Sequence, residues 1–229
     1  MSTLSISLIG LLGSMDWTSV LRYDPFNPLI FTRFFFWGFF AVVLMVFSAV
    51  YKRPPIRNAW LFVASIFFYW KTSGLFVGLL LFAVIMDFFL GQWSASSPDR
   101  SRKRWLLATS VFINLSLLGF FKYAHFVVDN INTLFHTSFQ PVNFFAHWAN
   151  MAWDAHFVEN KILLPVGISF YTFQTMSYAI DIYRNDVKPV RNLLDFGFYV
   201  SFFPQLVAGP IVRASEFIPQ LYEDFKLTR

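Results

Sequence analysis

The sequence predicts an all-α integral membrane protein, with about five transmembrane helices and one broken or re-entrant segment packed as a helical bundle. Composition is the first reason. Of the 229 residues, 56% are hydrophobic and only 14% are charged, whereas soluble domains average about 25% charged residues. Long uncharged runs are the second reason, and the charge of the loops between them is the third. A water-soluble globular domain is thereby excluded.

The N-terminal segment, residues 1–33, precedes the first long uncharged run. Residues 1–15 carry no charge, but they are rich in serine and glycine and lack the basic start of a secretory signal peptide. The sequence "DPFNP" at 24–28 is typical of a turn. We therefore expect an interfacial segment here.

Five uncharged runs predict the transmembrane helices, four within residues 34–121 and one at the start of the C-terminal part, 162–229. The second run has only 13 residues, fewer than the roughly 17–25 that a spanning helix needs. We still interpret it as a span, because Lys71 at its end can extend its side chain to the interface. The five runs are 34–51, 58–70, 72–86, 105–121 and 162–180.

The loop charges predict the orientation. Residues 52–57 contain three basic residues and no acid, 98–104 contain four against one, and 184–191 contain three against one. Residues 122–161 instead contain two lysines against three acids. The positive-inside rule then places the basic loops in the cytoplasm. The N-terminus and residues 122–161, expected as amphipathic helices and loops, fall outside. This distribution of the net charge of +5 indicates membrane lipid as a partner and no nucleic acid.

The run that contains "FFPQLVAGPIVR" (202–213) is interrupted by helix breakers. Proline removes a backbone donor, and a broken helix at membrane depth survives only inside protein or beside a water-filled cavity. Two interpretations stay open, a proline-kinked span or a re-entrant segment that satisfies its freed carbonyls with Gln205 and Arg213. The six-residue spacing of Pro204 and Pro210 favours re-entry, with a cytoplasmic tail.

A polar face runs along the preceding span. Tyr171, Gln174, Thr175 and Tyr178 recur at three-to-four-residue spacing, so they share one side of a helix. Polar side chains in a span normally face the bundle interior or a wet cavity. The residues are therefore either contacts between helices or the lining of a cavity.

Other site chemistry is limited by residue type. The chain has no cysteine, which excludes thiolate metal sites and cysteine nucleophiles. The four histidines are 11, 11 and 9 residues apart and lack the i, i+4 spacing of a helical metal pair, so we expect surface or packing histidines and no metal. Asp87 interrupts an apolar run, either as a functional group or as the partner of a polar neighbour. The histidines are His125, His136, His147 and His156.

Two long blocks resemble a known family. "LLPVGISFYTFQTMSYAIDIYR" (163–184) and "RNLLDFGFYVSFFPQLVAGPIVRASEFIPQL" (191–221) are similar to membrane-bound O-acyltransferases, specifically the alginate O-acetyltransferase branch. "RNAWLFVASIFFYW" (57–70) and "LLGFFKYAHFVVDNIN" (117–132) resemble the same branch. The resemblance thus covers residues 57–221.

The resemblance implies a partial bundle of that family around a tunnel through the inner membrane of a bacterium. A cytosolic acyl donor, acyl-CoA or a similar thioester, would be a substrate, and no cofactor would be bound. The acceptor would be an exported polysaccharide or a periplasmic partner protein. The expected substrate-contacting and tunnel-lining residues are Tyr171, Gln174, Tyr178, Gln205, Pro210 and Arg213.

The family's general base is a histidine downstream of the proline–glycine block, and histidine suits that role because its pKa lies near neutrality. No histidine follows His156 in this sequence. We therefore expect the chain to correspond to the N-terminal half of such an enzyme, with no catalytic residue of its own and no activity alone. The alternative is a transporter or an assembly subunit of a polysaccharide system, because broken polar helices also build carrier sites.

Overall fold

The computed structural model describes residues 34–153 and 164–223, together with Tyr23, Leu29, Phe31 and Ile162. Most of the expected interfacial segment 1–33 lies outside the described residues. The described part is helical, and no strand occurs in it. Its elements are α3 (Phe34–Val50), α4 (Pro54–Ser73), the 3₁₀ turn η1 (Gly74–Phe76), α5 (Val77–Ser96), α6 (Arg100–Phe135), α7 (Phe144–Trp153), α8 (Ile168–Arg184), α9 (Leu193–Ser201), α10 (Phe203–Ala208) and α11 (Ala214–Tyr222).

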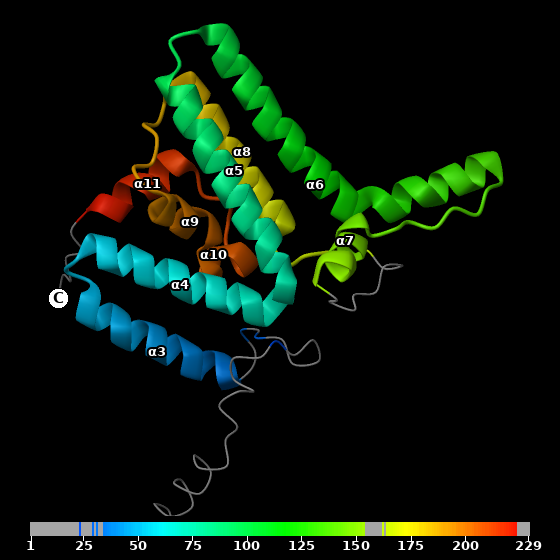
Figure 1. Cartoon of the computed structure of the whole chain (residues 1–229). Helices are drawn as coiled ribbons and strands as arrows, with labels where there is room; N and C mark the ends of the chain where they lie inside the picture. Colours follow the sequence, from blue (N-terminus) through cyan, green and yellow to red (C-terminus); the bar gives the residue numbers. More distant parts are fainter. Residues whose placement is uncertain are drawn as a thin grey trace, which may run out of the picture.

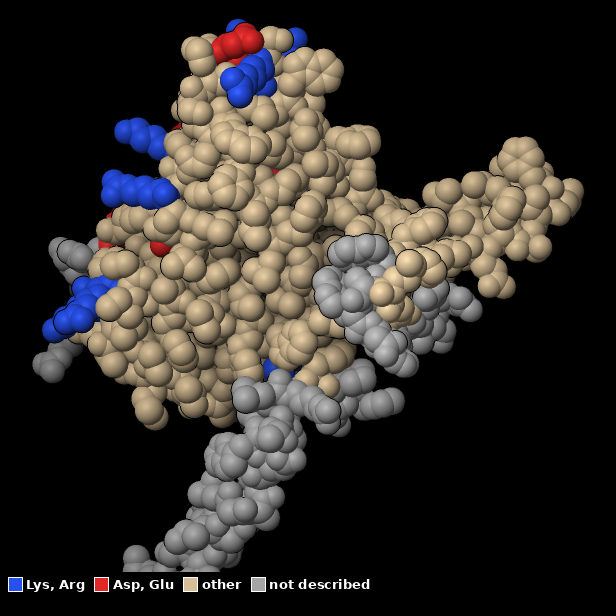
Figure 2. Space-filling model, viewed as in Figure 1, with Lys and Arg blue, Asp and Glu red and all other residues tan. Residues whose placement is uncertain are grey.

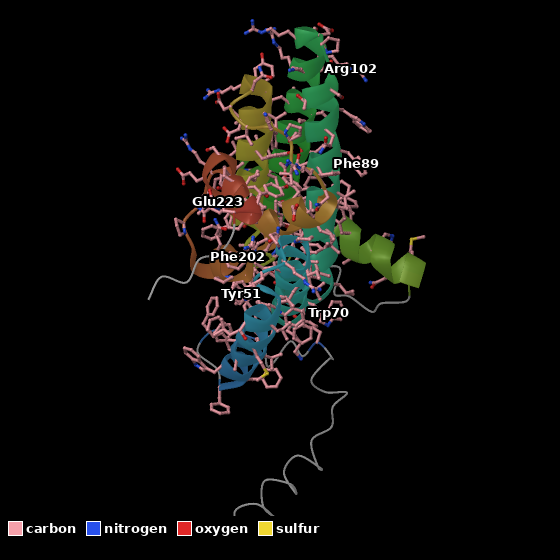
Figure 3. The ribbon with its side chains drawn as sticks, turned by 90° about the vertical axis from the view of Figure 1, so that its left-hand side faces the viewer. Tyr51, Trp70, Phe89, Arg102, Phe202 and Glu223 are labelled. Carbon is pink, nitrogen blue, oxygen red and sulfur yellow. The ribbon has the colours of Figure 1, made fainter. Side chains whose placement is uncertain are left out.

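Two helical stretches, Pro54–Ser96 and Arg100–Phe135, are long and apolar enough to cross a membrane. Large apolar side chains cover their outer surface; Phe112, for example, is 73% exposed. In Figure 3, Phe89 points away from the bundle. Such a surface suits lipid and not water, so the predicted class, an all-helical membrane protein, is confirmed.

Helices α5, α6 and α8 form the centre of the bundle. α5 packs against α6 and α8, α6 also packs against α8, and α9 lies between α4 and α5 (Figure 1). The shared core is rich in buried aromatic and aliphatic side chains, among them Tyr69, Val84, Tyr178 and Phe196. α3 packs against the outer side of α4 through a second cluster of phenylalanines.

Helix α4 is longer than the uncharged run that predicted it. It has 20 residues, about 30 Å at 1.5 Å per residue, because prolines at its first positions start the helix and Arg57 and Lys71 both lie within it. Two expectations were wrong. Arg57 is a buried residue in the first turn of α4 and not an exposed loop residue, and Lys71 does not extend outward; each residue is only 6% exposed.

Helix α6 differs from its prediction in the same way. It continues without a break for 36 residues to Phe135, where we expected residues 122–161 to be short helices and loops. Lys122 ends the uncharged run, but no proline or glycine lies between Gly119 and Pro141 to end the helix. The last turns of α6 project beyond the bundle (Figure 1), and α7 packs against the middle of α6 through Phe120, Phe121 and Phe145.

The three basic loops lie at one side of the molecule. Arg57 contacts the end of α11, the Arg191 guanidinium stacks 5.4 Å from the Tyr222 ring, and Lys103 Nζ donates to Asn185 Oδ1 at 3.1 Å. These contacts link the loops before α4, before α6 and after α8. Figure 2 shows the resulting cluster of Lys and Arg along one edge, as expected if all three loops share one side of a membrane.

Candidate functional site

Residues 192–223 fold back on themselves inside the bundle, and we call them the hairpin. α9 leads inward, the chain bends at Phe202, α10 follows, and extended residues 209–213 lead into α11, which returns (Figure 1). Every residue of α9 from Asp195 to Ser201 is buried. The inward arm α9 is thus enclosed by protein, whereas the irregular residues 209–213 are exposed or half-exposed. Irregular backbone at membrane depth needs protein or a water-filled cavity beside it.

Both ends of the hairpin are held at the start of α4. Asn58 Nδ2 donates to Asp195 Oδ1 at 2.9 Å, at the beginning of α9, and also to the Leu221 carbonyl at 3.3 Å, at the end of α11. Arg57 Nη2 donates to the same Leu221 carbonyl at 2.7 Å. We call Arg57, Asn58 and Asp195 the hairpin anchor. Because one pair of residues contacts both ends, the hairpin begins and ends at the same level of the bundle.

The sequence "NLLD" starts α9. The Asn192 side chain accepts a hydrogen bond from the Asp195 amide at 2.8 Å, and its Nδ2 donates to Asp195 Oδ2 at 2.8 Å. This is N-capping with an acid in the first turn, where the helix dipole favours negative charge. The cap orients the Asp195 side chain toward Asn58. A local interaction at the start of α9 thus supports the long-range hydrogen bond of the hairpin anchor.

The bend of the hairpin lies deeper in the bundle. Phe203 N donates to Ser65 Oγ at 3.2 Å, and Ser65 is seven residues beyond Asn58 on α4, about 10 Å along the axis. Gly167, just before α8, touches the far side of the same segment: a Cβ at Gly167 would lie 2.9 Å from the Leu206 carbonyl oxygen. The Pro165–Gly167 segment before α8 and the proline–glycine element predicted at 202–213 therefore meet at this bend.

Gln205 satisfies a carbonyl freed by the break, as the re-entrant interpretation expected. Its Nε2 donates to the Pro210 carbonyl at 3.3 Å, and Gly209 N donates to the Gln205 carbonyl at 3.0 Å. Gln205 Oε1 is buried with no hydrogen-bond partner among the described residues. Pro210 is exposed. The amide nitrogen of Gln205 is thus bonded within the hairpin. Its amide oxygen remains available to accept a hydrogen bond.

The predicted polar face of α8 is buried and is used largely for contacts between helices. Gln174 Nε2 donates to the Tyr199 carbonyl of α9 at 2.7 Å, and the Tyr199 hydroxyl donates to the Val212 carbonyl at 3.1 Å. The Tyr178 hydroxyl accepts from Val190 N at 3.2 Å, and its ring packs 4.6 Å from that of Phe196. Gln174 and Tyr178 therefore position the hairpin and the loop that precedes it.

Tyr171 is the member of this face with spare hydrogen-bonding capacity. It is 2% exposed, and its hydroxyl makes no hydrogen bond of good geometry within the described part of the chain. The Tyr69 hydroxyl interacts with it as a hydrogen-bonding group and donates to the Val166 carbonyl at 2.8 Å. Val166 adjoins Gly167, so Tyr171 lies near the bend. Unpaired buried polar atoms are rare, and the Tyr171 hydroxyl and Gln205 Oε1 are two of the six such side-chain atoms in the described part of the chain.

Asp87 is paired with polar neighbours, one of the two alternatives that the sequence left open. Ser110 Oγ donates to Asp87 Oδ1 at 2.5 Å and Asn114 Nδ2 to Asp87 Oδ2 at 2.7 Å. The Thr175 hydroxyl lies 3.2 Å from Asn114 Oδ1. These four side chains, the Asp87 network, join α5, α6 and α8, and each is at most 1% exposed.

Arg213 lies on the surface, at the start of α11. Its charge acts on Asp181, as does that of Arg184, which places it near the end of α8 with the basic loops.

His125, His136 and His147 are exposed, and His156 lies outside the described residues. No group of side chains suitable for a metal occurs in the described part.

Gly167→Ala is expected to destabilise the bend. Gly167 has a φ of +75°, which disfavours any side chain, and the added methyl would meet the backbone of Leu206. We expect a lower melting temperature of the full-length protein in detergent. Gly119→Ala, on an open face where no atom lies within 4 Å of the new Cβ, is the control and should not lower it. Equal stability of the two variants would contradict the contact.

Sequence reasoning missed the hairpin anchor. Arg57 was counted as a loop charge, and Asn58 and Asp195 were not singled out, because their contacts join residues more than 130 positions apart. One local signal was available, the Asn-x-x-Asp spacing at 192–195 that predicts a helix start.

These features define a helical membrane protein with a broken helical hairpin whose inward arm, α9, is buried. The chain is 37% identical over 190 residues to the probable alginate O-acetylase AlgI of Azotobacter vinelandii. It is 38% identical over 192 residues to that of Pseudomonas aeruginosa, and 30% identical over 229 residues to the peptidoglycan O-acetyltransferase of Helicobacter pylori. The resemblance to membrane-bound O-acyltransferases of the alginate O-acetyltransferase branch is therefore confirmed.

The matches cover most of this chain but a smaller part of each relative. They include 80%, 80% and 88% of the chain and 34%, 33% and 40% of the three relatives, respectively. The chain spans about a third of the length of the curated relatives it matches. No protein-family model and no solved structure matches the chain.

Proposed function

We propose that the full-length protein is an O-acetyltransferase to which this chain contributes the re-entrant hairpin and its supporting helices. The acyl group would leave a cytosolic thioester, such as acetyl-CoA, and form an ester with a hydroxyl of an exported polysaccharide or of a periplasmic acyl-accepting protein. The thiol would be released on the donor side. The names of the relatives, acetylases of alginate and of peptidoglycan, support this reaction class.

The observation that carries the proposal is the bend of the hairpin. Buried polar atoms of Tyr171 and Gln205 make no hydrogen bond of good geometry in the described part of the chain, and they lie beside backbone that is broken at membrane depth. A buried acceptor or donor without a partner costs about 1–3 kcal/mol. A substrate with hydroxyl and carbonyl groups would satisfy these atoms.

The expected site residues divide into two roles under this proposal. Tyr171, Gln205 and the Pro210 carbonyl face the acyl group or the acceptor, and Gln174 and Tyr178 position the hairpin. Arg213, on the side of the basic loops, meets the phosphates of the donor, because guanidinium groups bind phosphate bidentately. The positive-inside rule applied to the three basic loops supports five spans with the N-terminus outside. The bacterial relatives support a location in the inner membrane.

The test is the O-acetyl content of the exported polysaccharide in cells whose chromosomal gene is deleted and replaced by variants of the full gene. We expect deletion to abolish the modification. In membranes supplied with acetyl-CoA, Arg213→Ala should raise the KM for the donor about tenfold or more, as loss of a charge-assisted bidentate contact would. Arg53→Ala, an exposed basic control, should not. Unchanged O-acetylation in the deletion strain would refute the proposed function.

A further inference from the structure

A basic cavity separate from the hairpin lies at the end of the bundle. It has a volume of about 510 Å³ and sits between the first turn of α6 and the last turn of α8. Three of its lining residues are cations, and none is an acid. The lining comprises Pro98, Arg100, Lys103, Tyr183, Arg184 and Asn185.

The cations of this cavity come from two helices. Of the nearby acids, Asp181 interacts with Arg184, and it also interacts with Arg213 outside the cavity and with the like-charged Asp186. Lys103 Nζ is held by Asn185 Oδ1 at 3.1 Å, and the guanidinium groups of Arg100 and Arg104 interact with the Tyr183 hydroxyl. The nearest acid in sequence, Asp99, accepts from the amides of Ser101 and Arg102 at 2.9 and 3.3 Å as the cap of α6. Like charges gathered around one cavity repel each other unless an anion lies between them.

Exposed tryptophans indicate the depth of the cavity. Trp93 on α5 is 54% exposed and Trp105 on α6 is 73% exposed. Tryptophan on the outer surface of a membrane protein concentrates at the level of the lipid headgroups. Trp105 follows Arg104 directly, and Trp93 lies about one turn before the end of α5. The cavity therefore lies about one helical turn, roughly 5 Å, beyond the tryptophans, where lipid phosphates are found.

We propose that this cavity binds the phosphate group of an anionic phospholipid. Arg100 and Arg184 supply guanidinium donors from α6 and α8, and Lys103 supplies the third positive charge. Guanidinium groups match phosphate geometry, and basic pockets between helices on the cytoplasmic side are typical headgroup sites. A soluble phosphate compound offers the same charge, but a lipid also presents its phosphate at this depth beside exposed apolar helix surface.

The test uses the full-length protein, delipidated in a neutral detergent, with dioleoylphosphatidylglycerol as the probe. Bound lipid is counted by native mass spectrometry across a titration, with dioleoylphosphatidylcholine as the zwitterionic comparison. We expect saturable binding of phosphatidylglycerol in preference to phosphatidylcholine. The variant Arg100→Gln/Arg184→Gln should weaken it about tenfold or more, since each basic residue near anionic lipid contributes about fivefold. Both side chains are exposed, so the fold should persist, as size-exclusion chromatography will check.

Arg102→Gln is the matched control, because Arg102 is exposed on the same turn but does not line the cavity; in Figure 3 it lies near the start of α6. It should bind phosphatidylglycerol like the unmodified protein. Should the double variant misfold, the single variants Arg100→Gln and Arg184→Gln are each expected to bind about fivefold more weakly. Equal weakening by Arg102→Gln would overturn the site in favour of diffuse surface charge. Displacement of the lipid by millimolar glycerol 3-phosphate would overturn the lipid assignment in favour of a soluble phosphate ligand.

Discussion

Arg57→Ala is expected to lower the free energy of unfolding by about 3 kcal/mol, the scale of buried hydrogen bonds made by a charged group. The Arg57 guanidinium donates to the carbonyls of Leu221 and Glu223 and to Asn58 Oδ1. The last carbonyls of α11 have no partner within the helix, and a cation there also interacts favourably with the helix dipole. Without Arg57, the return arm of the hairpin loses its attachment.

The measurement for Arg57 is thermal unfolding of the full-length protein in detergent, together with amide exchange over residues 214–223. Exchange should accelerate in α11 more than in α5. Arg53→Ala removes the same charge from an exposed position four residues earlier and should change neither quantity. If both variants behave like the unmodified protein, α11 is not held by Arg57.

Asp87→Ala is expected to destabilise the central three helices by several kcal/mol. The substitution removes the acceptor for Ser110 and Asn114, and each donor left unpaired in a buried position costs about 1–3 kcal/mol. It also leaves a void where the carboxylate was. The expected result is a large fall in melting temperature and in the yield of folded protein from membranes.

Two further variants separate the Asp87 network from general sensitivity of the helices. Ser116→Ala, on an exposed face of α6, should be nearly neutral. The combination Asp87→Leu with Ser110→Ala and Asn114→Leu should recover part of the stability lost in Asp87→Ala, because it removes both donors to Asp87. The remaining Thr175 hydroxyl keeps its hydrogen bond to the Thr172 carbonyl, at 3.2 Å. A triple variant less stable than Asp87→Ala would contradict this explanation.

The sequence predicted the class of fold because hydropathy is a local property. Uncharged runs located α3, α4, α5, α6 and α8, but charges marked helix ends poorly. Arg57 and Lys71 lie inside α4 because protein, and not lipid, surrounds them. The continuation of α6 past Lys122 was missed because a charge can mark the edge of an apolar run without ending a helix.

The candidate site was predicted in part, for a related reason. Spacing placed Tyr171, Gln174 and Tyr178 on one face, and the structure buries all three. Spacing could not show which of these side chains would form hydrogen bonds. Gln174 donates to α9 and the Tyr178 hydroxyl accepts from Val190, whereas the Tyr171 hydroxyl makes no hydrogen bond of good geometry in the described part of the chain. That difference depends on which residues lie opposite, and a single sequence does not contain it.

The close approach of helices around the hairpin also could not be predicted from the sequence. Gly197 lies against α4, where an added Cβ would be 2.5 Å from the Phe62 ring, and Gly91 lies against Tyr178 at 2.7 Å. Both glycines interrupt helical runs and would ordinarily weaken them. They are tolerated because they allow α4 with α9 and α5 with α8 to approach closely.

The re-entrant hairpin is the central claim, and paired single cysteines test it most directly. The chain has no cysteine of its own, and Asn192, Glu223 and Gln140 are exposed. In a full-length protein without other cysteines, Asn192→Cys and Glu223→Cys should both resist a membrane-impermeant maleimide in intact cells and both react after permeabilisation. Gln140→Cys, predicted outside, should react in intact cells. Labelling of Glu223→Cys but not Asn192→Cys in intact cells would mean that the chain crosses the membrane between them, and the hairpin would be wrong.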